Sequence, residues 1–540
     1  MGTLYFGDNL DILREHIKDE SIDLIYLDPP FNSKQAYNLL FKTPKGHDSD
    51  AQITAFDDTW HWGSSDDQAE REFSQLLHQS NTDVSEMIQS LRRFLKESDM
   101  MAYLTMMANR LLELHRVLKP TGSLYLHCDP TASHYLKIVL DAVFGVENFQ
   151  NEIIWQRTNA HNFRTKGFVR SNDTILYYTK SQDFVFNEQY TEYGPEQLKR
   201  FKTDENGRLY KAENMTFSTA NPNRQFEWRG SKPPANRSWG ASLEQLEEWY
   251  AEGRILLKQD GTPRLDGLKI YLDETKGKPL TTNWTDIDRV SNTSGERLGY
   301  PTQKPLALLE RIIQASSNKA DVVLDPFCGC GTAVHAAQTL GREWIGIDIT
   351  SLAISLIEKR MKAAFPTITF KVEGTPKDLD GARNLAERDK YQFQWWACSL
   401  VEAQPYQGKK KGADTGIDGI IFFQDDAQGA KKIIVSVKGG EHVGRTMIAD
   451  LKNTVEREKA EIGLFVTLAE PTQPMLTEAA SAGFYESPKG QFPKIQILTI
   501  QDLLSGKSKP QYFDMSGGSL NFKKAKTEEK RADQNKLEGF

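Results

Sequence analysis

Apolar and polar positions in the first thirty residues alternate in a way that predicts a strand, a helix and a second strand. These elements are expected over Leu4–Phe6, Asn9–His16 and Ile22–Leu27. The second strand runs directly into Asp28-Pro29-Pro30-Phe31, and two consecutive prolines end a strand abruptly. In open α/β sheets, ligands bind at the carboxyl ends of strands, so Asp28 and Phe31 stand at a candidate ligand site.

The alternation of helix and strand continues beyond this unit. A helix from Ala102 to Leu118 is expected to end at Lys119-Pro120-Thr121-Gly122, and Ser123–His127 predicts the next strand. A further helix and strand are expected over Tyr135–Phe144 and Asn151–Trp155. This order predicts a doubly wound, Rossmann-like α/β fold with a parallel sheet.

Two segments interrupt the pattern. Residues 45–98 are polar, predict one amphipathic helix near their end, and suggest no role. Residues 157–300 are rich in Asn, Arg, Lys, Thr, Tyr and Trp, and only Asp173–Thr179 still predicts a sheet strand. A polar, aromatic and basic insertion in an α/β enzyme suits a polyanionic substrate, although a solvated loop region with no ligand is the alternative.

The α/β pattern returns at Pro301 and leads into a glycine-rich loop. The strand Val322–Leu324 precedes Asp325-Pro326-Phe327-Cys328-Gly329-Cys330-Gly331-Thr332, which opens a helix, and the next strand ends at Asp348. Glycines let the backbone approach a ligand closely, and an acid at the end of the following strand suits ribose hydroxyls. A nucleoside cofactor is therefore predicted. A nicotinamide enzyme is the competing interpretation, but the loop lacks the third glycine of the dinucleotide fingerprint.

Chain length and pattern together predict several domains. A chain of 540 residues is too long for one ordinary core. We expect one domain over residues 1–375 and a smaller α/β domain over 390–505. Residues 517–540 alternate Lys, Glu and Asn with few apolar residues, which predicts a disordered tail.

Composition limits the partners without naming one. A net charge of −7 gives no global attraction to polyanions, so a nucleic-acid partner requires local basic surface. The sequence begins without a signal peptide and contains no apolar run long enough to cross a bilayer, so no membrane partner and a cytoplasmic location are expected. Four cysteines are too few for a disulfide framework, and Cys328-Gly329-Cys330 lacks the second half of a metal site.

Several blocks of this sequence, in one order, resemble the DNA amino-methyltransferases, which methylate the exocyclic nitrogen of adenine or cytosine. The blocks are Gly7-Asp8-Asn9, Asp28-Pro29-Pro30-Phe31, the segment Leu118–Ser123, Thr302-Gln303-Lys304-Pro305 and the glycine loop. Their order, with the catalytic motif first and the cofactor loop last, is that of the permuted β group. The resemblance covers residues 1 to about 370 and implies S-adenosylmethionine as cofactor.

The resemblance assigns cofactor roles position by position. Asp348 is expected to accept the ribose hydroxyls of S-adenosylmethionine, and Asp8 the amino group of its adenine. Phe327, Gly329, Gly331 and Thr332 are expected around the methionine moiety, with Lys304 nearby, and Asp325 is expected to order the loop.

The resemblance also gives a reaction. Asp28 and the Pro29 carbonyl accept the two hydrogens of an exocyclic amine, Pro30 stiffens the motif, and Phe31 stacks on a base flipped out of double-stranded DNA. The acid at position 28 favours adenine N6 over cytosine N4, which stays the alternative. Residues 157–300 stand in the position of the target-recognition region. A homodimer is an open expectation.

The second domain resembles the Mrr-like restriction endonucleases. Asp418 and Lys438 take the positions of the metal-binding acid and the catalytic lysine, but Ser436 stands where Glu or Gln is expected. Glu402 could supply the missing carboxylate for Mg²⁺ if the domain is active. A bifunctional enzyme that also cleaves DNA, an inactive module, and a non-catalytic DNA-binding protein built from both folds are the alternatives.

Overall fold

A computed structural model of the chain describes residues 2–30, 36–42, 48–57, 62, 68–158, 167–291, 294, 296–298, 303–406, 416–426, 429–517 and 528. The predicted catalytic residue Phe31 and almost all of the predicted tail lie outside these residues. Glu188–Thr281 forms one compact unit, and Met1–Asn187 together with Thr282–Glu529 forms the other.

The larger unit is built on a sheet of nine strands in the described residues. In order across the sheet, the strands are β16 (Asn283–Trp284), β6 (Phe149–Gln156), β7 (Asn172–Thr179), β5 (Leu118–Cys128), β2 (Ile22–Leu27), β17 (Val322–Asp325), β18 (Glu343–Asp348), β1 (Gly2–Phe6) and β19 (Phe370–Glu373). Segments from both ends of the methylase-like region therefore meet at the centre, where β2 pairs with β17.

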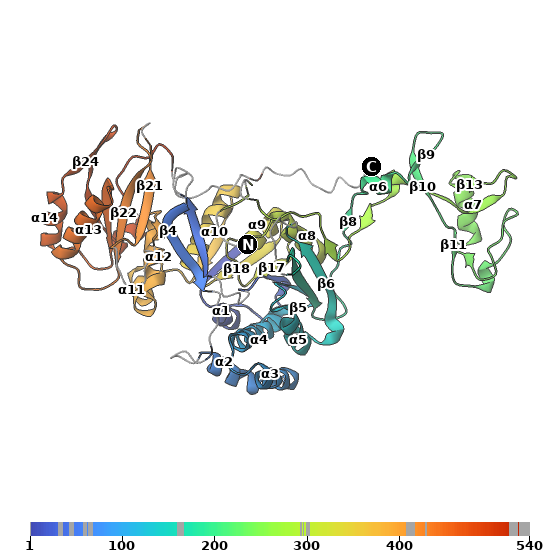
Figure 1. The fold of residues 1–540 in the computed structure, drawn as a ribbon, viewed down its shortest axis with the longest axis horizontal. Coiled ribbons are helices and arrows are strands. Elements are labelled where there is room, and N and C mark those ends of the chain that lie inside the picture. Colours follow the sequence, from blue (N-terminus) through green and yellow to red (C-terminus); the bar gives the residue numbers. More distant parts are fainter. Residues whose placement is uncertain are drawn as a thin grey trace. The chain divides into compact units, whose positions relative to one another are not determined.

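Neighbouring strands are parallel except at β7, which runs antiparallel to both β5 and β6. Helices cover both faces (Figure 1). One face carries α1 (Asn9–His16), α4 (Asp99–Val117) and α5 (Ser133–Phe144), and the other carries α8 (Leu306–Ser316), α9 (Thr332–Thr339) and α10 (Ser351–Ala364). The predicted doubly wound α/β fold is confirmed, with β7 as the exception to a fully parallel sheet.

The helix α4 ends where the sequence predicts, but the segment after it is not a separate turn. β5 already begins at Leu118, and a register shift against β2 absorbs the extra residues between Leu118 and Ser123. Lys119 stays in place because its Nζ lies 2.7 Å from Asp23 Oδ1 on β2. The predicted break is therefore a bulge within a strand.

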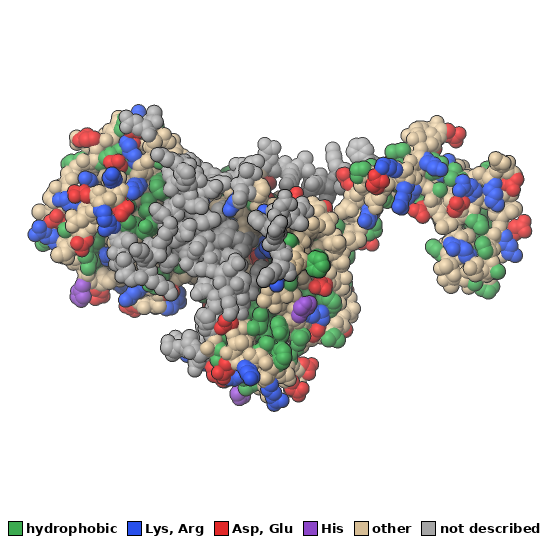
Figure 2. Space-filling model, in the orientation of Figure 1, with side chains coloured by type: hydrophobic (Ala, Val, Ile, Leu, Met, Phe, Trp, Pro, Cys, Tyr) green, Lys and Arg blue, Asp and Glu red, His purple; other side chains and the backbone are tan. Residues whose placement is uncertain are grey.

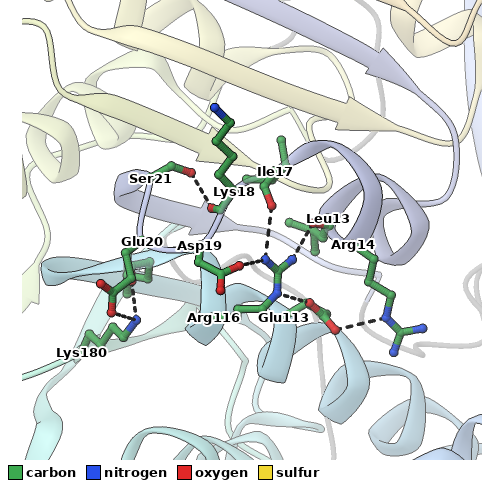
Figure 3. A network of polar contacts seen from close by, with 11 residues as sticks. Leu13, Arg14, Ile17, Lys18, Asp19, Glu20, Ser21, Glu113, Arg116 and Lys180 are labelled. Atoms are coloured by element: carbon green, nitrogen blue, oxygen red, sulfur yellow. Dashed lines mark hydrogen bonds and ion pairs between the residues drawn. The ribbon is translucent and has the colours of Figure 1, made fainter.

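A polar network fixes the entry into β2 (Figure 3). Arg116 on α4 donates from Nη2 to the carbonyl of Leu13 at 2.6 Å, and from Nη1 to the carbonyl of Ile17 at 3.3 Å. Its Nε donates to Glu113, which also accepts from Arg14. Arginine thus satisfies carbonyls left over at the end of α1, and this fixes the start of the strand that leads to Asp28.

The segment 45–98 contains two helices in its described part, so the prediction of one was wrong. These are α2 (Gln68–Leu77) and α3 (Thr82–Leu95), separated by Asn81, whose side chain accepts a hydrogen bond from Val84 N at 3.2 Å and caps α3. Apolar residues of both helices join the core beneath α4. A strand pair, β3 (Ala36–Lys42) and β4 (Asp48–Asp57), precedes them.

The unit Glu188–Thr281 is folded around tryptophans. Its core contains Trp228 and Trp239 with Leu246 and Leu268. Its elements are β8 (Tyr190–Thr191), α6 (Pro195–Leu198), β9 (Lys202–Thr203), β10 (Leu209–Glu213), β11 (Thr216–Phe217), β12 (Ser238–Trp239), α7 (Leu243–Ala251), β13 (Ile255–Leu257), β14 (Pro263–Tyr271) and β15 (Lys278–Pro279). The expectation of one strand in 157–300 was therefore wrong, because strands this short carry no readable period.

This unit is not basic. Residues 188–281 contain 15 Lys and Arg and 15 Asp and Glu, and positive and negative side chains are interspersed over its surface in Figure 2. Several arginines are held in ion pairs, such as Arg229 with Glu247 and Arg208 with Asp273. Affinity of this unit for a polyanion must therefore come from the local arrangement of charge.

The carboxyl-terminal α/β domain has its own sheet in the order β20-β21-β22-β23-β26. The strands are β20 (Gln404–Pro405), β21 (Gly419–Phe423), β22 (Lys431–Lys438), β23 (Ile462–Thr467) and β26 (Ile495–Thr499), and a hairpin of β24 (Phe484–Ser487) and β25 (Gly490–Pro493) lies apart. The helices are α11 (Leu379–Arg388), α12 (Lys390–Leu400), α13 (Arg445–Arg457), α14 (Gln473–Ser481) and α15 (Ile500–Leu504). Apolar residues such as Ile448 and Phe465 form its core.

Candidate active site

Asp28 lies directly after β2, at the carboxyl edge of the main sheet, and its two carboxylate oxygens differ. Oδ2 forms an ion pair with Nζ of Lys304. Oδ1 is buried and has no hydrogen-bond partner among the described residues. A buried acceptor without a donor is costly unless a ligand supplies one. Asp28 therefore presents one acceptor to whatever enters the site.

Lys304 and Asp28 are both largely shielded from water, with side chains 9% and 17% exposed. A buried carboxylate needs a compensating cation, and Lys304 provides it. The predicted cofactor residue Lys304 thus lies against the predicted catalytic residue, from a position 276 residues further along the chain. Lys304 links the two halves of the site.

The glycine loop joins β17 to α9 and is braced by two acids. The Oδ1 of Asp325 accepts a hydrogen bond from Phe327 N at 3.1 Å, and burial raises the pKa of Asp325 well above its ordinary value. Gly331 begins α9 in the left-handed region, and a Cβ there would lie 2.9 Å from Cγ1 of Ile357. Gly331 is required by packing and does not line the cavity described below.

Asp348 ends β18 beside the loop. Its Oδ2 accepts from Gly329 N at 2.9 Å, and its Oδ1 accepts from the backbone N and hydroxyl of Thr350 at 2.9 and 2.8 Å. Burial raises the pKa of Asp348. Each carboxylate oxygen has two lone pairs, so Asp348 can hold the loop and still accept from a ligand.

Asp8 lies at the start of α1 and is held by a residue that the sequence analysis missed. Its Oδ1 caps the helix by accepting from Leu10 N at 2.8 Å, and Arg110 Nη2 lies 3.0 and 3.1 Å from its two oxygens. Arg110 also donates to Asn9, whose amide donates to the carbonyl of Pro326 in the glycine loop at 2.8 Å. A charged residue on the buried face of α4 is the signal that could have revealed it.

One cavity brings most of the predicted residues together. Its walls include Asp8, Asp28, Pro29, Pro30, Lys304, Asp325, Phe327, Gly329, Thr332 and Asp348. They also include residues that were not predicted, among them Asn9, Tyr26, Arg110, Gln303 and Thr350. The catalytic motif and the glycine loop therefore open into a single space.

The residues predicted to hold a metal in the carboxyl-terminal domain do not form a metal site. Asp418 accepts from Gln394 Nε2 at 3.1 Å through Oδ1 and from Val437 N at 2.7 Å through Oδ2. Glu402 follows α12 and Lys438 ends β22. Within the ranges that the structure describes, no group of His, Cys, Asp and Glu side chains could hold a metal ion. Asp418 instead connects α12 to β22.

Comparison with known proteins identifies the family. Residues 22–359, more than half of the chain, match the N6/N4 methyltransferase family described as DNA methylase. The chain belongs to this N6/N4 DNA methylase family. Residues 398–505 match the family described as NACHT-associated inactive restriction endonuclease 1. The carboxyl-terminal domain is thus similar to an inactive endonuclease, and the alternative that it cleaves DNA is not favoured.

Individual relatives match parts of this family member. M.EcaI, a type II methyltransferase of Enterobacter cloacae, is 33% identical over 261 residues, 48% of this chain and 57% of that protein. The Mod subunit of the type III restriction-modification enzyme StyLTI from Salmonella typhimurium is 24% identical over 355 residues, 62% of this chain and 50% of that protein. The chain therefore spans little more than half the length of these relatives.

Solved structures match with low similarity. The complex of M1.HpyAVI with SAM is 16% identical, with a TM-score of 0.30, and the match covers 67% of this chain and all of that one. Among the described helices, none has both the length and the apolar character needed to span a bilayer.

Proposed function

We propose that this chain transfers a methyl group from S-adenosylmethionine to the exocyclic N6 of adenine in double-stranded DNA. The observation that carries the proposal is the single cavity in which the unpartnered Oδ1 of Asp28 and the glycine loop ending at Thr332 meet. An amine donor and a nucleoside cofactor are the two ligands these groups suit.

The chemistry of the amine explains the residue types at the catalytic motif. The lone pair of an exocyclic amine is delocalised into the base, which makes it a poor nucleophile. When Asp28 Oδ1 and the Pro29 carbonyl accept its two hydrogens, the nitrogen becomes more tetrahedral and its lone pair localises. Lys304 holds the other oxygen of Asp28, so the carboxylate is fixed for this in-line reaction.

The cofactor residues fit the proposed ligand. S-adenosylmethionine supplies an electrophilic methyl group when it is bound. Asp348 would hold its ribose and Asp8 its adenine, while Phe327, Gly329 and Thr332 would surround the methionine moiety. Gly329 N and Asp348 are already linked, so the loop is organised before any ligand arrives.

The acid at position 28 supports adenine as the target base. Among amino-methyltransferases this position is more typically acidic in adenine-N6 enzymes, and the motif order is that of the permuted β group. Cytosine N4 is the second candidate. The unit Glu188–Thr281 would carry the recognition of sequence, through contacts to base edges.

Methylation-sensitive sequencing of DNA from cells expressing the full chain tests this function. We expect N6-methyladenine at one position of one short recognition sequence, and no modification in cells expressing Asp28→Ala. N4-methylcytosine at a fixed site would favour the second candidate, and unmodified DNA would reject both.

We expect Lys438→Ala to methylate DNA at the wild-type rate. Lys438 lies in the domain similar to an inactive endonuclease, remote in sequence from the cavity residues. A plasmid incubated with the wild-type protein, S-adenosylmethionine and Mg²⁺ should also remain uncut, as judged by gel electrophoresis. Linearised plasmid with the wild-type protein but not with Lys438→Ala would restore the bifunctional alternative.

A further inference from the structure

A chain of buried polar side chains runs from the wall of the cavity across three strands. Tyr26 on β2, a lining residue, lies with its hydroxyl 3.0 Å from Nδ1 of His127 on β5. The Nε2 of His127 lies 3.2 Å from Oδ2 of Asp173 on β7. Asp173 also pairs with Arg157, at 3.3 Å. None of these residues belongs to the motifs that carry the family resemblance.

The burial of the chain fixes where its hydrogens lie. Tyr26, His127 and Asp173 are at most 3% exposed. Burial, followed by the charge of Lys304, lowers the pKa of His127, so the imidazole is neutral. Burial tends to raise the pKa of Asp173, but the hydrogen bond from His127 and nearby positive charges outweigh it and lower the pKa, so the carboxylate is ionised.

An ionised carboxylate can only accept, and a neutral imidazole has one N–H. The imidazole hydrogen therefore lies on Nε2 and points to Asp173. Nδ1 is then an acceptor, and the hydroxyl hydrogen of Tyr26 must point to it. The order of donors runs from Tyr26 to His127 to Asp173, away from the cavity.

The direction of these hydrogen bonds matters because Tyr26 and Asp28 line the same cavity. They lie two residues apart at the end of one strand, and alternate residues of a strand share a face. A tyrosine hydroxyl free to rotate there would be a ready donor to the unpartnered Asp28 Oδ1. Such a bond would occupy the acceptor that the amine requires.

We propose that His127 and Asp173 are positioning residues that hold the hydroxyl hydrogen of Tyr26 away from Asp28, so that the acceptor Oδ1 stays open to the amine. This inference rests on the proposed function only in that the substrate is an exocyclic amine of DNA, whichever base carries it. It assigns a catalytic task to a strand-crossing chain that ends at Arg157, outside the cavity.

Asp173→Asn provides the test because it keeps the side-chain shape and removes the charge. The amide can donate to Nε2, so the imidazole hydrogen moves to Nδ1 and the Tyr26 hydrogen is released, as a carboxylate-to-amide change does in a catalytic triad. We expect single-turnover methyl transfer to slow about tenfold, while the Kd for S-adenosylmethionine stays within about threefold.

The decisive variant combines Asp173→Asn with Tyr26→Phe. Removing the hydroxyl removes the misdirected hydrogen, so the double variant should transfer methyl groups faster than Asp173→Asn alone, and Tyr26→Phe alone should stay within about threefold of wild type. A purely structural role predicts the reverse, since a second buried substitution adds damage. Equal or slower transfer by the double variant would overturn the inference.

His127→Phe gives the same test if Asp173→Asn does not fold. It removes the acceptor for the Tyr26 hydrogen, and its loss of rate should again be relieved by Tyr26→Phe. Wild-type protein assayed on the same DNA separates the two proposals: no methyl transfer by wild type means that the proposed function fails, whereas active wild type without rescue means that only this inference fails.

Discussion

Asp28→Ala is expected to reduce methyl transfer to DNA about 1,000-fold or more, which corresponds to about 4 kcal/mol of transition-state stabilisation. The variant loses the only acceptor that the motif's side chains offer to the amine, because Oδ1 is the buried oxygen with no partner in the described residues. It also leaves Lys304 without its ion-pair partner in the cavity. Single-turnover assays with labelled S-adenosylmethionine measure the effect.

Cofactor binding separates this loss from a general failure of the site. The loop contacts of Asp348 with Gly329 and Thr350 do not involve Asp28, so the Kd of Asp28→Ala for S-adenosylmethionine should stay within about threefold of wild type. Asp129→Ala is a matched control, since Asp129-Pro130 also follows a strand of this sheet but does not line the cavity. The control should retain near wild-type transfer. A variant lacking Asp28 that still methylates DNA would refute the role given to this acid.

Asp348→Ala is expected to weaken S-adenosylmethionine binding about 100-fold, or about 3 kcal/mol. The carboxylate accepts three hydrogen bonds from Gly329 and Thr350, and each partner left unsatisfied costs about 1–3 kcal/mol. The proposed ribose contacts are lost as well. Isothermal titration calorimetry with the full chain measures the affinity.

The isosteric change Asp348→Asn grades this prediction. An asparagine keeps one oxygen as acceptor but turns the other position into a donor, which conflicts with Gly329 N or with Thr350. We expect a loss of about tenfold, between wild type and Asp348→Ala. Wild-type affinity in Asp348→Ala would show that the acid neither shapes the loop nor touches the cofactor.

Local patterns in the sequence predict elements well where apolar periodicity is strong. The strand–helix–strand opening over residues 2–27 and the strand and helix around the glycine loop lie where the sequence places them. These elements are formed from continuous apolar runs or faces that the main sheet buries. The unit Glu188–Thr281 gave no such signal, because its core depends on tryptophans such as Trp228 and Trp239 drawn from short strands.

Contacts between distant segments explain what the sequence could not predict about the site. Lys304 was expected near the cofactor, but its pairing with Asp28 spans 276 residues, and the bond between Asn9 and Pro326 spans 317. Such contacts depend on β2 and β17 lying side by side, which no local pattern encodes. Arg110 and His127 were missed for the same reason, since each sits in an otherwise apolar element.

The magnesium site failed for a related reason. Asp418 and Lys438 stand at the sequence positions of an endonuclease, but the Asp418 carboxylate is used to join Gln394 to Val437. A motif gives residue types and spacing, and only the fold shows whether an oxygen remains available to a metal.

Nucleoside mass spectrometry tests the central claim most directly. Double-stranded DNA would be incubated with the purified full chain and S-adenosylmethionine carrying a deuterated methyl group, then digested to nucleosides. Deuterated N6-methyladenine, absent with Asp28→Ala, is the predicted result. Deuterated N4-methylcytosine in its place, or no deuterated nucleoside with the wild-type chain, would contradict the proposed function.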